Sequence, residues 1–170
     1  MRKVTVLHLH LLNQFGGGVY HSVSEIIRGL DPGHYHQILC FLNGPVPESE
    51  SLQVDGFDVR ELPYRREDLH HFHPKIIHHI RQFVKDEKVD IIHTHRHKST
   101  VYATLAAIGV KNVKIVSSVH GMDWSRTLGR RLSNRLLWPR VNKIVAVSQA
   151  VREDIFTHNK WCPLEKVITR

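Results

Sequence analysis

Short apolar runs that alternate with helical patterns are the feature that most constrains how this chain folds. Several runs are apolar on consecutive residues, as in Val-Thr-Val-Leu at residues 4–7. Strands buried on both faces have this composition, which indicates a parallel sheet covered by helices. The sequence therefore predicts a doubly wound, Rossmann-like α/β domain. The expected strands are Val4–His10, Gln37–Leu42, Asp58–Leu62, Asp90–Thr94, Lys114–Val119 and Lys143–Val147, and the expected helices lie near Val19–Leu30, Pro74–Glu87, Ser99–Ile108, Arg126–Trp138 and Gln149–His158.

The length and the net charge of the chain limit the class of protein to which it can belong. A chain of 170 residues predicts a single domain, residues 1–170. It carries 24 Lys and Arg against 16 Asp and Glu, a net charge of +8, which favours phosphorylated ligands, acidic membrane surfaces or nucleic acid. No RNA-binding motif, zinc finger or recognition helix supports nucleic acid. Cys40 and Cys162 lie far apart without metal spacing, which fits a reduced, cytosolic compartment.

A glycine run follows the first apolar segment. Phe15-Gly16-Gly17-Gly18 joins that segment to the first helical pattern. Glycines allow backbone N–H groups to approach an anion closely, and a helix N-terminus supplies free donors. The run matches neither the dinucleotide fingerprint nor a P-loop. It therefore indicates either a phosphate-binding turn or a tight turn without a ligand.

Two further polar loops follow expected strands. The fourth strand leads into residues 93–99, and the fifth leads into residues 119–123. Ligands of open α/β sheets bind outside the carboxyl ends of the strands, where the strand order reverses. The classic order makes the first and fourth strands neighbours, so we expect Gly16–Gly18, His95 and His120 on one rim of the sheet.

Four segments resemble glycosyltransferase family 4. Gly17-Gly18 followed by Val23, Ile27 and Leu30 is similar to the family's glycine-containing start. The other three resemblances lie in KVDIIHTH at residues 88–95, SVHG at 118–121 and IVAVSQAV at 144–151. They occur in the family's order and cover nearly the whole chain. The resemblance implies the N-terminal half of a GT-B fold enzyme.

The resemblance also implies an activity and a site. It implies retaining transfer of a sugar from a nucleotide-diphosphate sugar to an acceptor, with no bound cofactor or metal. Gly17 and Gly18 would bind the donor, and His120 would be the catalytic residue that contacts the donor sugar. The acceptor side would be lined by His95, Arg96, Lys98 and Ser99.

The chain ends at Arg170, where the family enters its interdomain crossing. We therefore expect the C-terminal nucleotide-binding domain to be absent and this half alone to have little activity. The alternative function is a non-catalytic α/β module that binds phosphate or other anions. A second domain in the same reading frame would separate the two hypotheses.

Fifteen histidines invite a metal hypothesis. His93, His95 and His97 alternate and would share one face of a continued strand, which would give a three-histidine site. The alternative is that such histidines, including the group at residues 70–79, lie on the surface of a basic chain. We interpret His8 and His10, near the end of the first strand, as structural residues.

The stretch 123–140 is strongly basic. It carries five arginines and one carboxylate, Asp123, which gives a net charge of +4. The arginines are Arg126, Arg130, Arg131, Arg135 and Arg140. Leucines recur at helical spacing, with Trp124 and Trp138 near the ends. This pattern predicts either a helix that docks on an anionic bilayer or an ordinary helix whose leucines pack in the core. The first hypothesis predicts a cytoplasmic, peripheral membrane enzyme of cell-envelope polysaccharide biosynthesis, with a lipid-linked or lipopolysaccharide-type acceptor.

Overall fold

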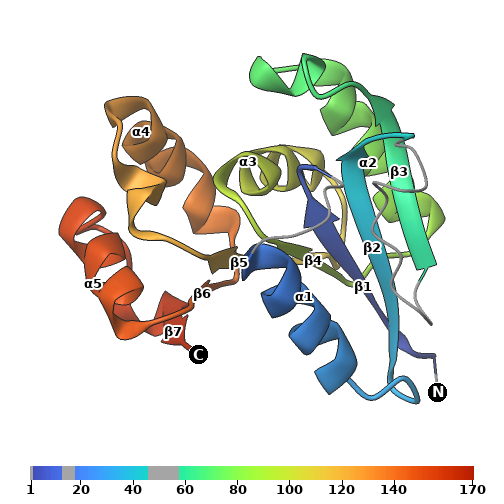
Figure 1. Cartoon of the computed structure of the whole chain (residues 1–170), viewed down its shortest axis with the longest axis horizontal. Helices are drawn as coiled ribbons and strands as arrows, with labels where there is room; N and C mark the ends of the chain where they lie inside the picture. The colour runs from blue at the N-terminus through green and yellow to red at the C-terminus, as the bar shows by residue number, and fades with distance from the viewer. Residues whose placement is uncertain (1, 13–17, 46–57) are drawn as a thin grey trace.

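The protein is built on one seven-stranded sheet whose strand pairs are all parallel (Figure 1). The computed structural model describes residues 2–12, 18–45 and 58–170. The strand order is β3-β2-β1-β4-β5-β6-β7. The first and fourth strands are neighbours, as predicted, and the order of the strands along the sheet reverses between them. The strands are β1 Val4–His10, β2 Tyr35–Asn43, β3 Asp58–Tyr64, β4 Ile91–Thr94, β5 Lys114–Val119, β6 Lys143–Ala146 and β7 Val167–Thr169.

Strand β7 was not expected from the sequence. It pairs with β6 through Ile144↔Val167, Val145↔Ile168 and Ala146↔Thr169, and it forms one edge of the sheet. A strand of three residues is too short to show a period, so its sequence resembles a connecting segment. The chain end that we interpreted as an interdomain crossing is therefore part of the sheet.

Five α-helices match the predicted ones within about two residues. They are α1 Gly18–Gly29, α2 Pro74–Asp86, α3 His97–Ala106, α4 Leu128–Leu137 and α5 Gln149–His158. The start of α4 is fixed by a cap, because Thr127 Oγ1 accepts a hydrogen bond from the Arg130 amide. Helix α5 begins in the same way, at Ser148.

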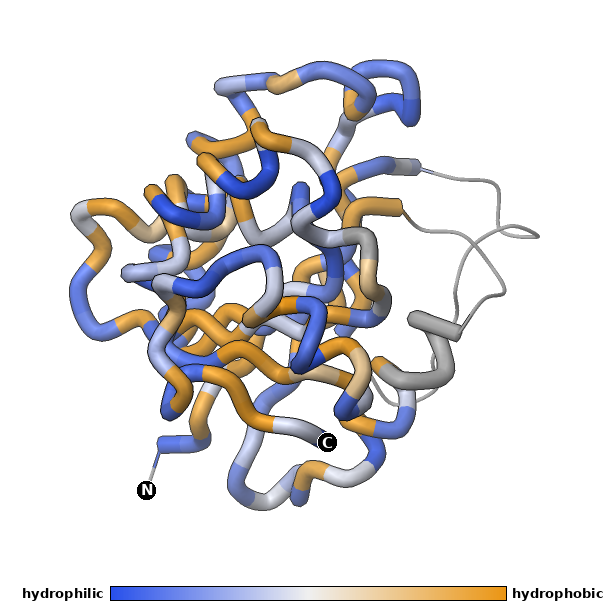
Figure 2. Tube along the Cα trace, turned by 90° about the vertical axis from the view of Figure 1, so that its left-hand side faces the viewer, coloured by the Kyte–Doolittle hydropathy of each residue, from blue (hydrophilic) through white to orange (hydrophobic). Residues whose placement is uncertain are grey.

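Helices cover both faces of the sheet, with α1 on one face and α2 and α3 on the other (Figure 1). Val23 and Ile27 of α1 pack on Leu39 and Phe41 of β2. The intervening residues of β2 point to the opposite face, because side chains alternate along a strand. There Leu7 and Leu9 of β1 pack in a second cluster with α2 and α3. Hydrophobic residues accordingly follow the strands through the middle of the molecule (Figure 2).

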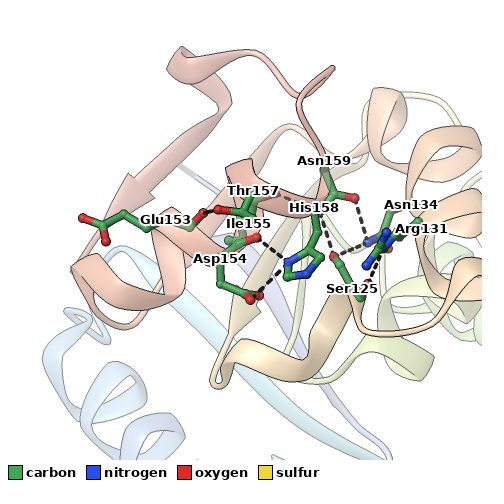
Figure 3. Close-up of polar contacts among 9 residues, drawn as sticks. All are labelled: Ser125, Arg131, Asn134, Glu153, Asp154, Ile155, Thr157, His158 and Asn159. Atoms are coloured by element: carbon green, nitrogen blue, oxygen red, sulfur yellow. Dashed lines mark hydrogen bonds and ion pairs between the residues drawn. The ribbon is translucent and has the colours of Figure 1, made fainter.

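Helix α4 is attached to the protein through polar contacts (Figure 3). Asn134 Nδ2 donates to Ser125 Oγ at 3.1 Å and to Asn159 Oδ1 at 3.3 Å, and Asn159 Nδ2 donates to Ser125 Oγ at 2.7 Å. All three side chains are buried. Arg131 adds a bond from Nε to the Ser125 carbonyl at 2.8 Å. The inward side of α4 is therefore polar.

As a result, three of the four leucines of α4 are exposed, and only Leu137 is half-buried. Leu128, Leu132 and Leu136 are 80%, 59% and 62% exposed. They are spaced by four residues, so they form one stripe on the side of the helix away from Asn134. The hypothesis that these leucines pack on the sheet is therefore wrong.

Candidate active site

A cavity of about 670 Å³ opens at the carboxyl ends of the central strands. Its floor comes from the loops after β1, β4 and β5, which contribute Leu11 and Leu12, residues 95–98, and His120. This is the rim at which the strand order reverses. Its walls come from the segment before α2 and from α3, η2 (Met122–Ser125) and α4, through Arg66, Leu69, His70, Phe72, Val101, Tyr102, Trp124, Arg130 and Ser133.

The cavity combines cations with apolar surface. Arg66, Arg96, Lys98 and Arg130 contribute positive charge, and no carboxylate occurs among its described lining residues. Phe72 is 57% exposed and stacks on the Tyr102 ring with a centroid separation of 5.7 Å. A wall of this composition suits an anionic molecule that also carries an apolar part.

His95 and His120 meet at the cavity floor. His120 Nε2 lies 3.4 Å from His95 Nδ1, although the two residues come from different loops. Burial lowers the pKa of both, and the positive charges of Arg96 and Arg170 lower that of His120 further. Both rings are therefore neutral at pH 7. A neutral imidazole is both donor and acceptor, the form suited to contacts with sugar hydroxyls.

Lys98 holds two walls of the cavity together. Its Nζ donates to the carbonyl of Leu69, and to that of His70 at 3.0 Å. Partial burial lowers the pKa of this ammonium group. Lys98 thus ties the first turn of α3 to η1 (Asp68–His70), while Arg96 is exposed at the cavity wall.

Ser99 was expected on the acceptor side, but it does not line the cavity. Its side chain is completely buried, and Oγ has no hydrogen-bond partner. Because α3 begins at His97, Ser99 lies in the first helical turn and faces inward. The expected donor residue Gly17 lies outside the described residues, and Gly18 is the first residue of α1.

Several lining residues carried no usable sequence signal. Arg66 and Phe72 precede α2, whereas Arg130 and Trp124 follow β5, and only the fold brings them together. The sole local signal was the histidine-rich group at 70–79, to which we assigned a surface position. One of its members, His70, lines the cavity.

The predicted alternation of His93, His95 and His97 does not produce a shared face. Strand β4 ends at Thr94, and His97 begins α3. There His97 Nε2 lies 3.1 Å from Asn134 Oδ1 and 3.2 Å from Ser133 Oγ. His8 takes its place beside the other two, because His8 and His93 are register partners in β1 and β4.

The family follows from comparison with known proteins. The chain matches the model of Glycosyltransferase Family 4 over residues 16–168 and belongs to this family. No curated protein sequence matches it.

Solved structures share the fold at low sequence identity. The apo form of the lipopolysaccharide outer core galactosyltransferase WaaB has a TM-score of 0.68 and 14% identity, covering 97% of this chain and 44% of that one. A glycosyltransferase from Rickettsia africae ESF-5 gives 0.64 and 18%, covering 99% and 43%. UDP-GlcNAc 2-epimerase from Neisseria meningitidis bound to UDP-GlcNAc gives 0.65 and 14%, covering 98% and 45%. The chain thus spans less than half the length of these proteins and corresponds to the N-terminal half of the GT-B fold.

Proposed function

We propose that this domain is the acceptor-side half of a retaining glycosyltransferase that uses a nucleotide-diphosphate sugar. The observation that carries the proposal is the cation-lined cavity at the switch point of the sheet, with His120 at its floor. In the reaction, an acceptor oxygen forms a bond to the anomeric carbon on the face from which the diphosphate leaves, and its proton passes to the departing diphosphate. The bond from that carbon to the diphosphate breaks, and the nucleoside diphosphate leaves with the electron pair.

Residues of this chain would contact both groups that the breaking bond joins, the donor sugar and the diphosphate. His120 would contact the donor sugar through its neutral ring, and Gly17 and Gly18 would let backbone donors approach the diphosphate. Preorganised donors and cations that meet the charge developing on the leaving group lower the barrier. The nucleotide itself would bind a second domain, and no metal is needed at the diphosphate if these groups supply the charge.

The cavity composition supports an anionic acceptor with an apolar part. Arg96 and Arg130 would face its charged groups, while Phe72 and Leu12 would contact its apolar portion. A lipid-linked or lipopolysaccharide-type glycan has both features. The name of one fold relative, a lipopolysaccharide outer core galactosyltransferase, is consistent with such an acceptor.

The exposed side of α4 supports a peripheral membrane position for the enzyme. Leu128, Leu132 and Leu136 form an apolar stripe, Arg135 is exposed on the same helix, and Arg126 is exposed two residues before it. Such a surface suits the interface of an anionic bilayer. None of the described helices is long and apolar enough to cross a membrane.

The structure changes two parts of this membrane hypothesis. Trp124 and Trp138 are buried, so they stabilise the domain and do not reach a bilayer. Arg131 is bonded to the Ser125 carbonyl, which makes it a structural residue. Arg126 and Arg135 would contact lipid together with the leucine stripe, whereas Arg130 lies on the Asn134 side of the helix and lines the cavity. Because Arg130 and Ser133 of the same helix line the cavity, a membrane-bound acceptor would lie beside the site.

The deciding experiment is a transfer assay on the enzyme that joins this domain to a nucleotide-binding domain. Nucleotide sugars would be offered with a lipid-linked acceptor, and the anomeric configuration of the product would be read by NMR. Transfer with retained configuration supports the proposal. Phosphate binding without any transfer supports the alternative, a non-catalytic anion-binding module.

A further inference from the structure

Three buried histidines meet on the α1 side of the sheet. His8 of β1 and His93 of β4 are register partners, and His95 follows two residues later. One ring nitrogen from each lies within 4.8 Å of those of the other two. The side chains are 0%, 8% and 0% exposed. Three imidazoles rarely lie together in the protein interior without a common partner. A buried nitrogen lone pair needs a hydrogen-bond donor or a metal ion.

The orientation of the His8 ring is fixed by its neighbour. Gln37 Nε2 donates to the carbonyl of Ile27 at 2.9 Å, so Gln37 Oε1 faces His8 Nε2 at 3.2 Å. An amide oxygen only accepts, so His8 carries its proton on Nε2. Its Nδ1 is then a lone-pair acceptor, which is buried and has no hydrogen-bond partner.

Polar groups outside the cluster orient the rings of His93 and His95 in the same way. His93 Nε2 lies 2.8 Å from Ser118 Oγ, and His95 Nδ1 faces His120. His95 Nε2 is buried without a partner. His8 and His95 therefore each have one nitrogen that faces an outer group and a second, buried nitrogen without a hydrogen-bond partner, and His93 is held by an outer group through Nε2. Metal-ligating histidines have this arrangement, since the outer hydrogen bond sets the tautomer and the ring direction.

The electrostatic surroundings keep the rings in the ligating form. Burial lowers the pKa of His8 to about 4 and lowers those of His93 and His95 well below the ordinary value. Neutral imidazole binds metal without first losing a proton. Imidazole-only sites favour Zn²⁺ and its neighbours in the first transition row over Mg²⁺ or Ca²⁺.

We propose that His8, His93 and His95 bind one first-row divalent cation of the Zn²⁺ type, in a structural site that ties β1 to β4 below the cavity. His10 adds a further ring beside the cluster: its centroid lies 4.8 Å from that of His95, and its Nε2 is buried without a partner. The site is separate from the diphosphate chemistry of the proposed transfer.

The test is a Co²⁺ titration of the metal-free, 170-residue chain, followed by visible absorption and by displacement with Zn²⁺. We expect one equivalent to give the intense spectrum of a low-symmetry, four- or five-coordinate ion. His8→Gln and His93→Gln should each abolish this spectrum. The matched control, His71→Gln with His78→Gln, removes two exposed histidines that do not line the cavity and should leave the spectrum unchanged.

A second variant avoids the ligands themselves. Gln37→Leu should lower the affinity about 10- to 100-fold, because it releases the His8 ring from its outer hydrogen bond. Circular dichroism of each variant would check that it is folded. The proposal is overturned if the wild-type chain gives no such spectrum, or if the control loses the spectrum. It is also overturned if folded His8→Gln binds as tightly as wild type.

Discussion

Nε2 of His120 lies 3.4 Å from Nδ1 of His95, so a half-buried ring at the cavity wall rests on a ring that no solvent reaches. The contact fixes the position of His120 from below. It leaves His120 Nδ1 as the nitrogen with which this ring can meet a ligand in the cavity. A small change at His120 should therefore affect the proposed transfer before it affects the fold.

His120→Ala should lower the turnover of the two-domain enzyme by about 100-fold or more, because it removes a preorganised contact to the donor sugar. The domain should remain folded, since His120 is only partly buried. The measurement is steady-state kinetics with the correct donor. Lys111→Ala, at an exposed position outside the cavity, is the control. Near-normal turnover of His120→Ala would remove His120 from the mechanism.

Gly17→Val should also abolish transfer. A branched side chain would block the close approach of backbone donors to the diphosphate that we infer from the sequence. Isothermal titration with the nucleotide sugar separates a binding defect from a chemical one. We expect the affinity for the donor to fall together with turnover, and unchanged kinetics would reject the role of the glycine run.

Acid should destabilise the metal-free domain through its buried histidines. Burial, with Arg96, His120 and His8, lowers the pKa of His10 to about 3. Between about pH 6.5 and pH 3, the unfolded chain therefore binds a proton at His10 that the folded chain does not bind. The free energy of unfolding consequently falls as the pH falls from 6.5 toward 3. At pH 5 this one group costs about 2 kcal/mol.

His10→Phe isolates this effect, because a phenyl ring beside Phe41 does not titrate. Urea unfolding at pH 7.5 and pH 5, with chelator present, would give the two free energies. We expect the wild type to lose about 2 kcal/mol more than the variant over this range. Equal losses would show that His10 is protonated in the folded state.

The polar attachment of α4 should be sensitive to one substitution. Asn134→Ala removes the bonds to Ser125 and Asn159, and it leaves His97 without its amide partner. We expect the free energy of unfolding to fall by about 2 kcal/mol, since buried polar groups lose partners. Gln149→Ala, which removes a single exposed hydrogen bond to Glu153, should change it by less than about 0.5 kcal/mol.

The fold was predictable because its evidence is local. Consecutive apolar residues mark β1 and β6 in the sequence. The three-residue strand β7 has too few side chains to show a period. The expected strand order also predicted one rim for His95 and His120, which lie next to each other, although their roles remain predictions.

The side of each helix that packs was not predictable from the same pattern. The leucine spacing of α4 is typical of a core-facing helix, yet buried Asn134 turns that stripe outward. Trp124 and Trp138 look like interfacial anchors in the sequence, but they fill the core. His97 fails to join His93 because β4 ends one residue after His93, and a strand end depends on its partners. Each of these outcomes depends on contacts between distant segments.

The leucine stripe of α4 should bind the domain to anionic membranes, beside a cavity in which a lipid-linked acceptor would react. Co-sedimentation with vesicles of anionic and of neutral lipid would measure binding at low and high salt. Wild type should bind anionic vesicles at low salt. Arg126 and Arg135, changed together to Gln, should weaken binding by up to about 2 kcal/mol, since each cation near such a surface contributes about 1 kcal/mol within a Debye length.

A matched control removes the same charge elsewhere. Lys75 and Lys85 are exposed on α2, and changing both to Gln should leave most of the binding intact. Leu128, Leu132 and Leu136 changed to Gln should remove the salt-resistant part of the binding, because only insertion of apolar side chains survives high salt. If wild type does not sediment with anionic vesicles, or if the lysine and arginine variants lose binding equally, α4 has no membrane role. A soluble anionic acceptor would then fit the cavity better.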